Sequence, residues 1–273
     1  MRIRLSIKQN KPDQLIPINY QFLISSFIYR TIENSDSKYS KWLHDSGFMN
    51  GIKNFKMFTF SKLNIPKSSF VSLYGKNFLK VESSKIEFII SMLSNKTVEN
   101  FITGMFMDQK MNIYEKNIES EFTVNTVEMV PEPEVREEMI FKTISPMVIS
   151  RSSIHNGKLS QEYMSPEDPE YFKYLKKNIA EKHTALMMSK NGSEIDGKSL
   201  GEIKLGSIES FELKGNCKSK LITIKEGTAE ETKIKGYYLT FKIKGNPELI
   251  RTSYEAGFGK HCSLGFGCVQ EIR

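Results

Sequence analysis

Cysteine is scarce in this chain of 273 residues, and the few cysteines are not spaced as pairs or metal ligands. Cys217, Cys262 and Cys268 are odd in number and include no Cys-x-x-Cys motif. This pattern argues against a disulfide framework and against a zinc knuckle, and it predicts a protein of the reducing cytoplasm.

Long apolar segments are absent as well. The first residues, Met-Arg-Ile-Arg-Leu, alternate polar and apolar side chains like a strand and lack the apolar centre of a secretory signal. No apolar run approaches the length that spans a bilayer. We therefore expect a cytoplasmic protein without a membrane partner.

The spacing expected of metal ligands is missing from the chain too. Its histidines and carboxylates do not show the one-face spacing of a zinc site or a two-metal site. We expect no metal and no other cofactor, so an enzyme built on this chain would depend on side-chain acids, bases and positive charge.

Positive charge is what the chain has in excess. Its 39 Lys and Arg residues outnumber its 32 Asp and Glu residues and give a formal net charge of +7. Such a balance favours a polyanionic partner such as nucleic acid, although a solvated basic surface without a partner would give the same balance.

Residues 1–130 are predicted to form a first domain with the order strand, helix, strands, helix, strand. Ser84 and Glu87 form a capping box that predicts the second helix. The expected elements are a strand at 2–8, helices at 20–33 and 37–45, strands at 56–63, 70–74 and 78–81, a helix at 85–93, and strands at 98–108 and 112–130.

Residues 131–138, Pro-Glu-Pro-Glu-Val-Arg-Glu-Glu, are predicted to be a linker, after which the order restarts in residues 139–273. The elements expected there are a strand at 139–149, a helix at 166–187, strands at 202–213, 220–225 and 234–244, a helix at 247–256 and a strand at 268–272. This order predicts an α+β protein of two tandem ferredoxin-like (RRM-like) domains.

A glycine-rich segment lies close to the C-terminus. It reads Gly-Phe-Gly-Lys-His-Cys-Ser-Leu-Gly-Phe-Gly and spans residues 257–267. Glycine concentrates where the backbone takes left-handed conformations or lies close to another surface. Two interpretations stay open: a turn packed between helix and strand, or a loop whose N–H groups approach phosphates.

Histidine suits proton transfer near neutral pH. Of His44, His155, His183 and His261, only His44 ends a predicted helix just before a turn, where its side chain can reach a cleft. RNA carries its own nucleophile, the 2′-hydroxyl. A protein that cleaves it needs one base, one acid and a positive charge near the phosphate, so a Tyr, a His and a Lys suffice.

Six further segments accompany the glycine-rich segment, in order along the whole chain. They are Pro17-x-x-Tyr20, Phe-Ile-Tyr29-Arg-Thr-Ile, Trp-Leu-His44, Lys56-Met-Phe-Thr-Phe-Ser61, Ile144-Ser-Pro-Met-Val-Ile149 and Asn156-Gly-Lys158. Together these segments resemble the CRISPR-associated repeat-processing endoribonucleases of the RAMP superfamily, and the glycine-rich segment matches the C-terminal signature of that family.

The resemblance implies two ferredoxin-like domains and metal-independent cleavage of CRISPR precursor RNA within its repeat, leaving 5′-hydroxyl and 2′,3′-cyclic phosphate ends. It places the catalytic residues at Tyr29, His44 and Lys56. Lys53 competes with Lys56 because the loop after His44 is longer than the family pattern. Which of Tyr29 and His44 is the acid stays open.

The expected partner is CRISPR repeat RNA, with other effector-complex subunits or a second copy of the chain as further partners. The residues expected to contact the RNA are Arg2, Arg4, Lys53, Arg151, Lys158, Gly257, Gly259, Lys260, Gly265 and Gly267. Two alternatives remain: a non-catalytic relative that only holds the repeat, and a ferredoxin-like RNA-binding protein unrelated to CRISPR.

Overall fold

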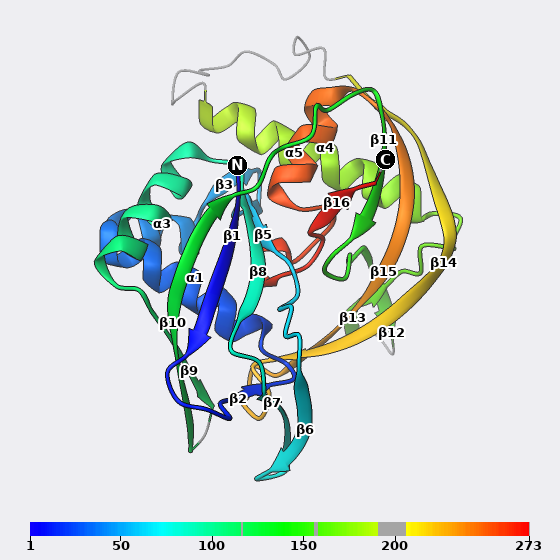
Figure 1. Cartoon of the computed structure of the whole chain (residues 1–273). Helices are drawn as coiled ribbons and strands as arrows, with labels where there is room; N and C mark the ends of the chain where they lie inside the picture. The colour runs from blue at the N-terminus through cyan, green and yellow to red at the C-terminus, as the bar shows by residue number, and fades with distance from the viewer. Residues whose placement is uncertain (116, 156–157, 191–205, 273) are drawn as a thin grey trace.

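The computed structural model describes residues 1–115, 117–155, 158–190 and 206–272, without the side chains of residues 154–159 and 190. The start of the strand expected at 202–213 and most of the Asn156-Gly-Lys158 match therefore lie outside the described residues. The chain forms two α+β halves that pack side by side (Figure 1).

The first half is built on a five-stranded sheet in the order β5-β8-β1-β10-β9. All its neighbouring strands are antiparallel. Helices α1 and α3 pack on each other against this sheet. The elements are β1 (Arg2–Gln9), α1 (Gln21–Ser35), β5 (Phe58–Phe60), β8 (Ile86–Met92), α3 (Asn95–Met107), β9 (Lys110–Glu115) and β10 (Ile118–Met129). Without β9, this is the strand order of a ferredoxin-like fold.

The helix predicted at 85–93 is wrong in its position. Residues 86–92 form strand β8, and the helix α3 follows it. Ile86, Phe88 and Ile90 are buried in strict alternation, which is the period of a strand. That alternation outweighs the Ser84 and Glu87 capping box, which contributes only at a helix terminus.

Helix α3 occupies part of the segment that was predicted as a strand over 98–108. Val98, Phe101 and Met105 are buried and recur at the spacing of a helix face. The topology was therefore predicted correctly although one helix was placed too early in the chain.

The second half repeats the plan with a four-stranded sheet in the order β14-β15-β11-β16. The elements are β11 (Glu138–Thr143), α4 (Tyr171–Lys190), β14 (Ile208–Ile224), β15 (Thr232–Gly245), α5 (Pro247–Ala256) and β16 (Val269–Glu271). The strands predicted at 202–213 and 220–225 belong, where described, to the single strand β14. Its register shifts between Lys214 and Lys218, where Gly215 has φ +74°.

Helix α5 matches its predicted bounds because both ends carry strong signals. The Asn246 side chain accepts a hydrogen bond from the N–H of Glu248, and Pro247 occupies the first turn. Gly257 ends the helix with φ +90° and leads into the glycine-rich segment.

Several shorter elements lie outside the two main sheets. Helix α2 (Ser37–Asp45) has the predicted bounds, and the hairpin of β3 (Phe48–Asn50) and β4 (Lys53–Phe55) follows it. The others are β2 (Leu15–Pro17), β6 (Ser68–Leu73), β7 (Lys76–Val81), β12 (Ser150–His155) and β13 (Lys158–Tyr163). Within the described part of the chain, no helix is both long enough and apolar enough to cross a membrane.

Buried polar contacts join the two halves. The Thr59 hydroxyl donates to the carbonyl of Phe266 at 2.8 Å. The Ser91 hydroxyl donates to the carbonyl of Glu255 at 2.7 Å. Because these bonds connect β5 and β8 to the C-terminal part of the chain, the glycine-rich segment is held against the first half.

Candidate active site

Tyr29 and His44 lie together although fifteen positions separate them in the sequence. Tyr29 is half-buried on α1, and its ring centroid lies 5.2 Å from that of His44 and 5.5 Å from that of Phe58. Helices α1 and α2 are in contact, so the end of α2 places His44 beside Tyr29.

The rings of Tyr29, His44 and Phe58 form one cluster. His44 lies at its edge, with most of its side chain exposed to solvent. Its Nδ1 lies 3.0 Å from Oδ1 of Asp45. The hydrogen bond with His44 lowers the pKa of the exposed Asp45 carboxyl, and the nearby positive charges act in the same direction. Asp45 was not predicted as part of the site, although its position next to His44 in the sequence was a usable signal.

Of the two competing lysines, Lys56 lies beside His44. Its Nζ donates to the backbone carbonyl of His44 at 2.6 Å. Partial loss of hydration lowers the pKa of Lys56, while Asp45 opposes this effect. Lys53 instead donates to both carboxylate oxygens of Glu181 on α4, at 2.6 and 2.7 Å.

The glycine-rich segment reaches the same cluster through Ser263. This residue lies in a short 3₁₀ helix over Cys262–Leu264, and its side chain is near enough to the Tyr29 hydroxyl to affect the pKa of that group. Burial raises the pKa of Tyr29 well above that of an exposed phenol, against the opposing effect of Ser263. Sequence reasoning missed Ser263, although it lies inside the signature segment.

Glycines of the segment are required by packing within the protein. Gly259 has φ +82°, and a Cβ there would lie 2.4 Å from the carbonyl oxygen of Val148. Gly267 has φ +72°, and a Cβ there would lie 1.9 Å from the carbonyl oxygen of Phe258. Both positions combine a left-handed backbone with a close approach of another backbone segment.

The predicted role of two of these glycines in phosphate binding needs correction. The N–H of Gly265 donates to the carbonyl of Cys262 at 2.9 Å, and the N–H of Gly267 donates to the carbonyl of Pro146 at 2.8 Å. These N–H groups are therefore not free for RNA phosphates. For Gly257 and Gly259, an RNA contact remains a prediction.

A buried lysine on α4 also binds the glycine-rich segment. Lys182 is 3% exposed, and its Nζ donates to the carbonyls of Gly257 and Gly259 at 2.5 and 3.0 Å. The same Nζ lies 3.5 Å from Sγ of Cys262. Lys182 was not predicted as part of the site, and no sequence motif marks it.

Arg2 is wrongly predicted as an RNA contact. It is 2% exposed, its guanidinium lies 3.6 Å from the centre of the Tyr254 ring, and it donates to the carbonyls of Val269 and Tyr254 at 2.5 and 2.8 Å. A third hydrogen bond reaches the Ser91 hydroxyl at 3.2 Å. The alternating strand pattern did not reveal that this arginine connects the two halves of the molecule.

We expect Arg2→Met to lower the free energy of unfolding by about 3 kcal/mol, because it leaves buried acceptors without their donor. Urea unfolding measures this change. RNA affinity per folded molecule should stay at the wild-type value, and a selective loss of affinity at unchanged stability would contradict the assignment.

The remaining predicted RNA contacts differ in their surroundings. Arg4 is exposed on β1, with its guanidinium 3.7 Å from Glu128. Arg151 is surrounded by the carboxylates of Glu162, Asp168 and Glu170, which argues against a free phosphate contact there. Lys260 is half-buried and donates to the backbone and hydroxyl oxygens of Ser150, both at 2.9 Å. The Lys158 side chain lies outside the described residues.

His261 is half-buried in a left-handed conformation with φ 59°, and its buried Nε2 has no hydrogen-bond partner among the residues that the structure describes. Burial, followed by the charge of Lys260, lowers its pKa to about 4. An unfolded chain binds this proton at a pKa of about 6.5, so protonation favours unfolding. Its contribution to stability is therefore complete above about pH 6.5 and declines as the pH falls towards 4.

We expect the free energy of unfolding of the His261→Asn variant to fall less than that of the wild type as the pH is lowered from about 6.5 to about 4.5, because the titrating group is gone. Asparagine tolerates the left-handed backbone that this position needs. Urea unfolding at a series of pH values measures the difference. Parallel pH dependences for the two proteins would contradict this assignment.

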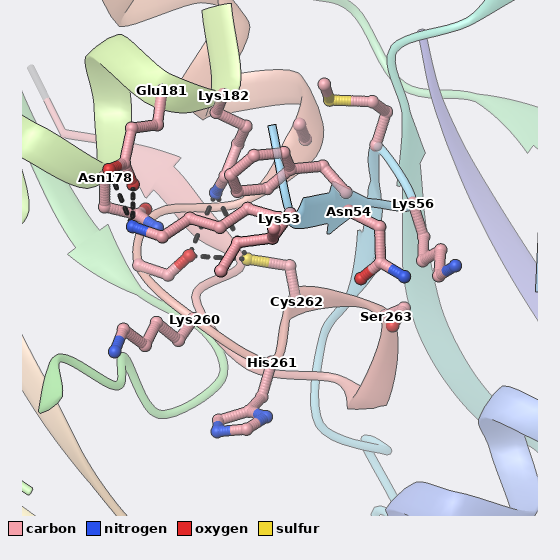
Figure 2. A pocket seen from close by; sticks show the side chains of 15 residues that line it. Lys53, Asn54, Lys56, Asn178, Glu181, Lys182, Lys260, His261, Cys262 and Ser263 are labelled. Atoms are coloured by element: carbon pink, nitrogen blue, oxygen red, sulfur yellow. Dashed lines mark hydrogen bonds and ion pairs between the residues drawn. The ribbon is translucent and has the colours of Figure 1, made fainter. Parts of the chain in front are cut away.

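A cavity of about 370 Å³ opens beside the cluster, between β4, α4 and the glycine-rich segment (Figure 2). It shares Lys56 and Ser263 with the cluster. A second hollow, of about 480 Å³, is lined by Tyr29 and His44 themselves, together with residues of α2. Within the described ranges, no group of three or more His, Cys, Asp or Glu side chains is arranged to hold a metal ion.

Solved structures with the same architecture define the class of the protein. A structure described as a Cas6-related gene product from Pyrococcus furiosus superimposes with a TM-score of 0.79 at 22% identity, over 100% of this chain and 98% of its own. A structure described as CRISPR associated protein Cas6 gives a TM-score of 0.72 at 27% identity, over 100% and 99%. The chain thus has the tandem ferredoxin-like fold of these proteins.

Family models identify it further. The model for the N-terminal part of CRISPR-associated protein Cas6 matches residues 15–128, and the model for the C-terminal part matches residues 130–271. The chain belongs to the Cas6 family. It is 28% identical to CRISPR-associated endoribonuclease Cas6 1 of Methanocaldococcus jannaschii, over 100% of this chain and 93% of that protein. It is 25% identical to CRISPR-associated endoribonuclease Cas6 of Pyrococcus furiosus, over 93% and 83%.

Proposed function

We propose that this protein cleaves CRISPR precursor RNA within its repeat, without a metal ion. The observation that carries the proposal is the convergence of Tyr29, His44 and Lys56 where the glycine-rich segment meets the first half of a Cas6 chain. The relatives named as CRISPR-associated endoribonucleases support the same activity.

The reaction needs no group beyond these side chains. The 2′-oxygen loses its proton to a base and attacks the adjacent phosphorus, while the bond from phosphorus to the 5′-oxygen breaks. An acid protonates the leaving 5′-oxygen, which yields a 2′,3′-cyclic phosphate and a 5′-hydroxyl. A positive charge beside the phosphate stabilises the additional negative charge of the transition state.

The surroundings of each group suggest its role. Because its pKa is raised, Tyr29 stays a neutral phenol that can donate to a phosphate oxygen or to the leaving oxygen. His44 is then the base, with its Nδ1 held by Asp45 and Nε2 left for the 2′-hydroxyl. Lys56, whose ammonium lies at the end of α2, supplies the positive charge.

Incubating the protein with its repeat RNA and with a scrambled RNA of equal composition, both in excess EDTA, tests this function. Cleavage of the repeat alone is the expected result. Tight binding without cleavage would instead identify a scaffold protein, and equal treatment of the two RNAs would identify a general RNA-binding protein. The cytoplasmic location and an association with effector subunits or a second copy remain predictions from the sequence.

A further inference from the structure

The 370 Å³ cavity has the composition of a nucleotide site. Phe55, Met57 and Ala256 give it an apolar wall, and it lies within the size range of small-molecule pockets. Its charged lining is positive in balance, with a single carboxylate, that of Glu181. The lysines that line it are Lys53, Lys56, Lys182 and Lys260.

Two buried polar atoms of the residues that line this cavity lack a partner within the described part of the chain, Nε2 of His261 and Oδ1 of Asn178. Asn178 of α4 is 6% exposed, and its Oδ1 makes no hydrogen bond within the described part of the chain. Buried amide oxygens are nearly always bonded, because leaving one unpaired costs free energy. The side-chain amide of asparagine is also well suited to pairing with the edge of a nucleobase.

We propose that this cavity binds the nucleobase next to the scissile phosphate, with Asn178 accepting a hydrogen bond from an N–H group of that base. The inference rests on the proposed function, which places the scissile phosphate at Tyr29, His44 and Lys56. A base in the cavity adjoins that point because Lys56 and Ser263 line both places. Asn178 is then a specificity-determining residue.

Lys53 closes the polar end of the cavity in the free protein. It reaches from β4 to Glu181, and Glu181 lies three residues after Asn178 on the same face of α4 (Figure 2). The phosphate of an entering nucleotide offers the Lys53 ammonium a second anion. When Lys53 moves from Glu181 to this phosphate, Asn178 becomes accessible to the base. Glu181→Gln should therefore tighten RNA binding by about threefold, and unchanged or weaker binding would contradict this step.

A double-mutant cycle on an uncleavable RNA tests the site itself. The RNA is the repeat with a 2′-deoxy nucleotide before the scissile phosphate, in one intact form and in forms that each carry one abasic position. We expect one abasic position beside the scissile phosphate to weaken wild-type binding by about tenfold. Asn178→Leu should weaken binding of the intact RNA by a similar factor. On that abasic RNA the substitution should cause no further loss of affinity.

Asn178→Leu also separates a binding role from a structural one. Leucine has a similar size, and an apolar group in place of an unpaired oxygen should leave the unfolding temperature unchanged or raise it. The matched control is Asn112→Leu on β9, another asparagine whose Oδ1 is unpaired among the described residues, and this variant should bind every RNA like the wild type.

If the binding losses from Asn178→Leu and from the abasic position were additive at every abasic position, the proposal would be overturned. A loss of stability in Asn178→Leu equal to its loss of binding would also overturn it. The cycle measures binding, so it reports on the cavity whether or not unmodified RNA is cleaved. A wild-type protein that shows the coupling but never cleaves would refute the proposed function alone.

Discussion

His44→Ala should slow cleavage of the repeat RNA by about 10²- to 10⁴-fold, which is the contribution of a positioned general acid or base. His44 is largely exposed and packs edge-on against the ring of Tyr29, so its removal should leave the fold intact. Binding of the uncleavable repeat should stay within about threefold of the wild type, since an exposed contact contributes little. Single-turnover cleavage rates measure the effect.

Met49→Ala is the matched control for this change. Met49 is 51% exposed on the hairpin that follows α2, and it takes no part in the proposed chemistry. It should cleave at the wild-type rate. If His44→Ala did so too, the proposed catalytic role of His44 would be refuted.

Gly267→Ala should lower the free energy of unfolding by about 4 kcal/mol or more, because the added methyl group overlaps backbone that cannot move aside. Its Cβ would lie 1.9 Å from the carbonyl oxygen of Phe258. Urea unfolding of the variant and the wild type gives the difference. Any folded variant should also cleave more slowly, since a displaced segment moves Ser263 away from Tyr29.

Gly75→Ala supplies a close control. Gly75 has the same φ of +72° in the β6–β7 turn, and a Cβ there would meet nothing within 4 Å. It carries only the cost of a left-handed alanine, about 1–2 kcal/mol. Equal losses for the two variants would show that backbone conformation, and not the contact with Phe258, makes glycine necessary at position 267.

The fold was predictable because each half carries its own order of strands and helices. Helices α1, α2 and α5 have clear periods or end signals, and α5 has the predicted bounds, ending at Gly257. The displaced helix at 85–93 shows the limit of local signals. A capping box describes one turn, whereas the buried alternation of β8 is set by its two neighbours in the sheet.

The site was predictable as residue types but not as contacts. The family resemblance placed Tyr29, His44 and Lys56, and the structure brings these three together. The resemblance could not show that Lys53 is paired with Glu181 on α4, because that contact spans the two halves of the chain. For the same reason the structural roles of Arg2 and Lys182 were hidden, since their partners are backbone carbonyls distant in the sequence.

The most direct test of the account is cleavage of one repeat RNA in two forms, with excess EDTA present. One form is all-ribose, and the other has a single 2′-deoxy nucleotide before the scissile phosphate. Attack by the 2′-hydroxyl predicts that the first is cut to a 2′,3′-cyclic phosphate and that the second is bound but stays intact. Cleavage of both forms at the same rate would contradict the proposed mechanism.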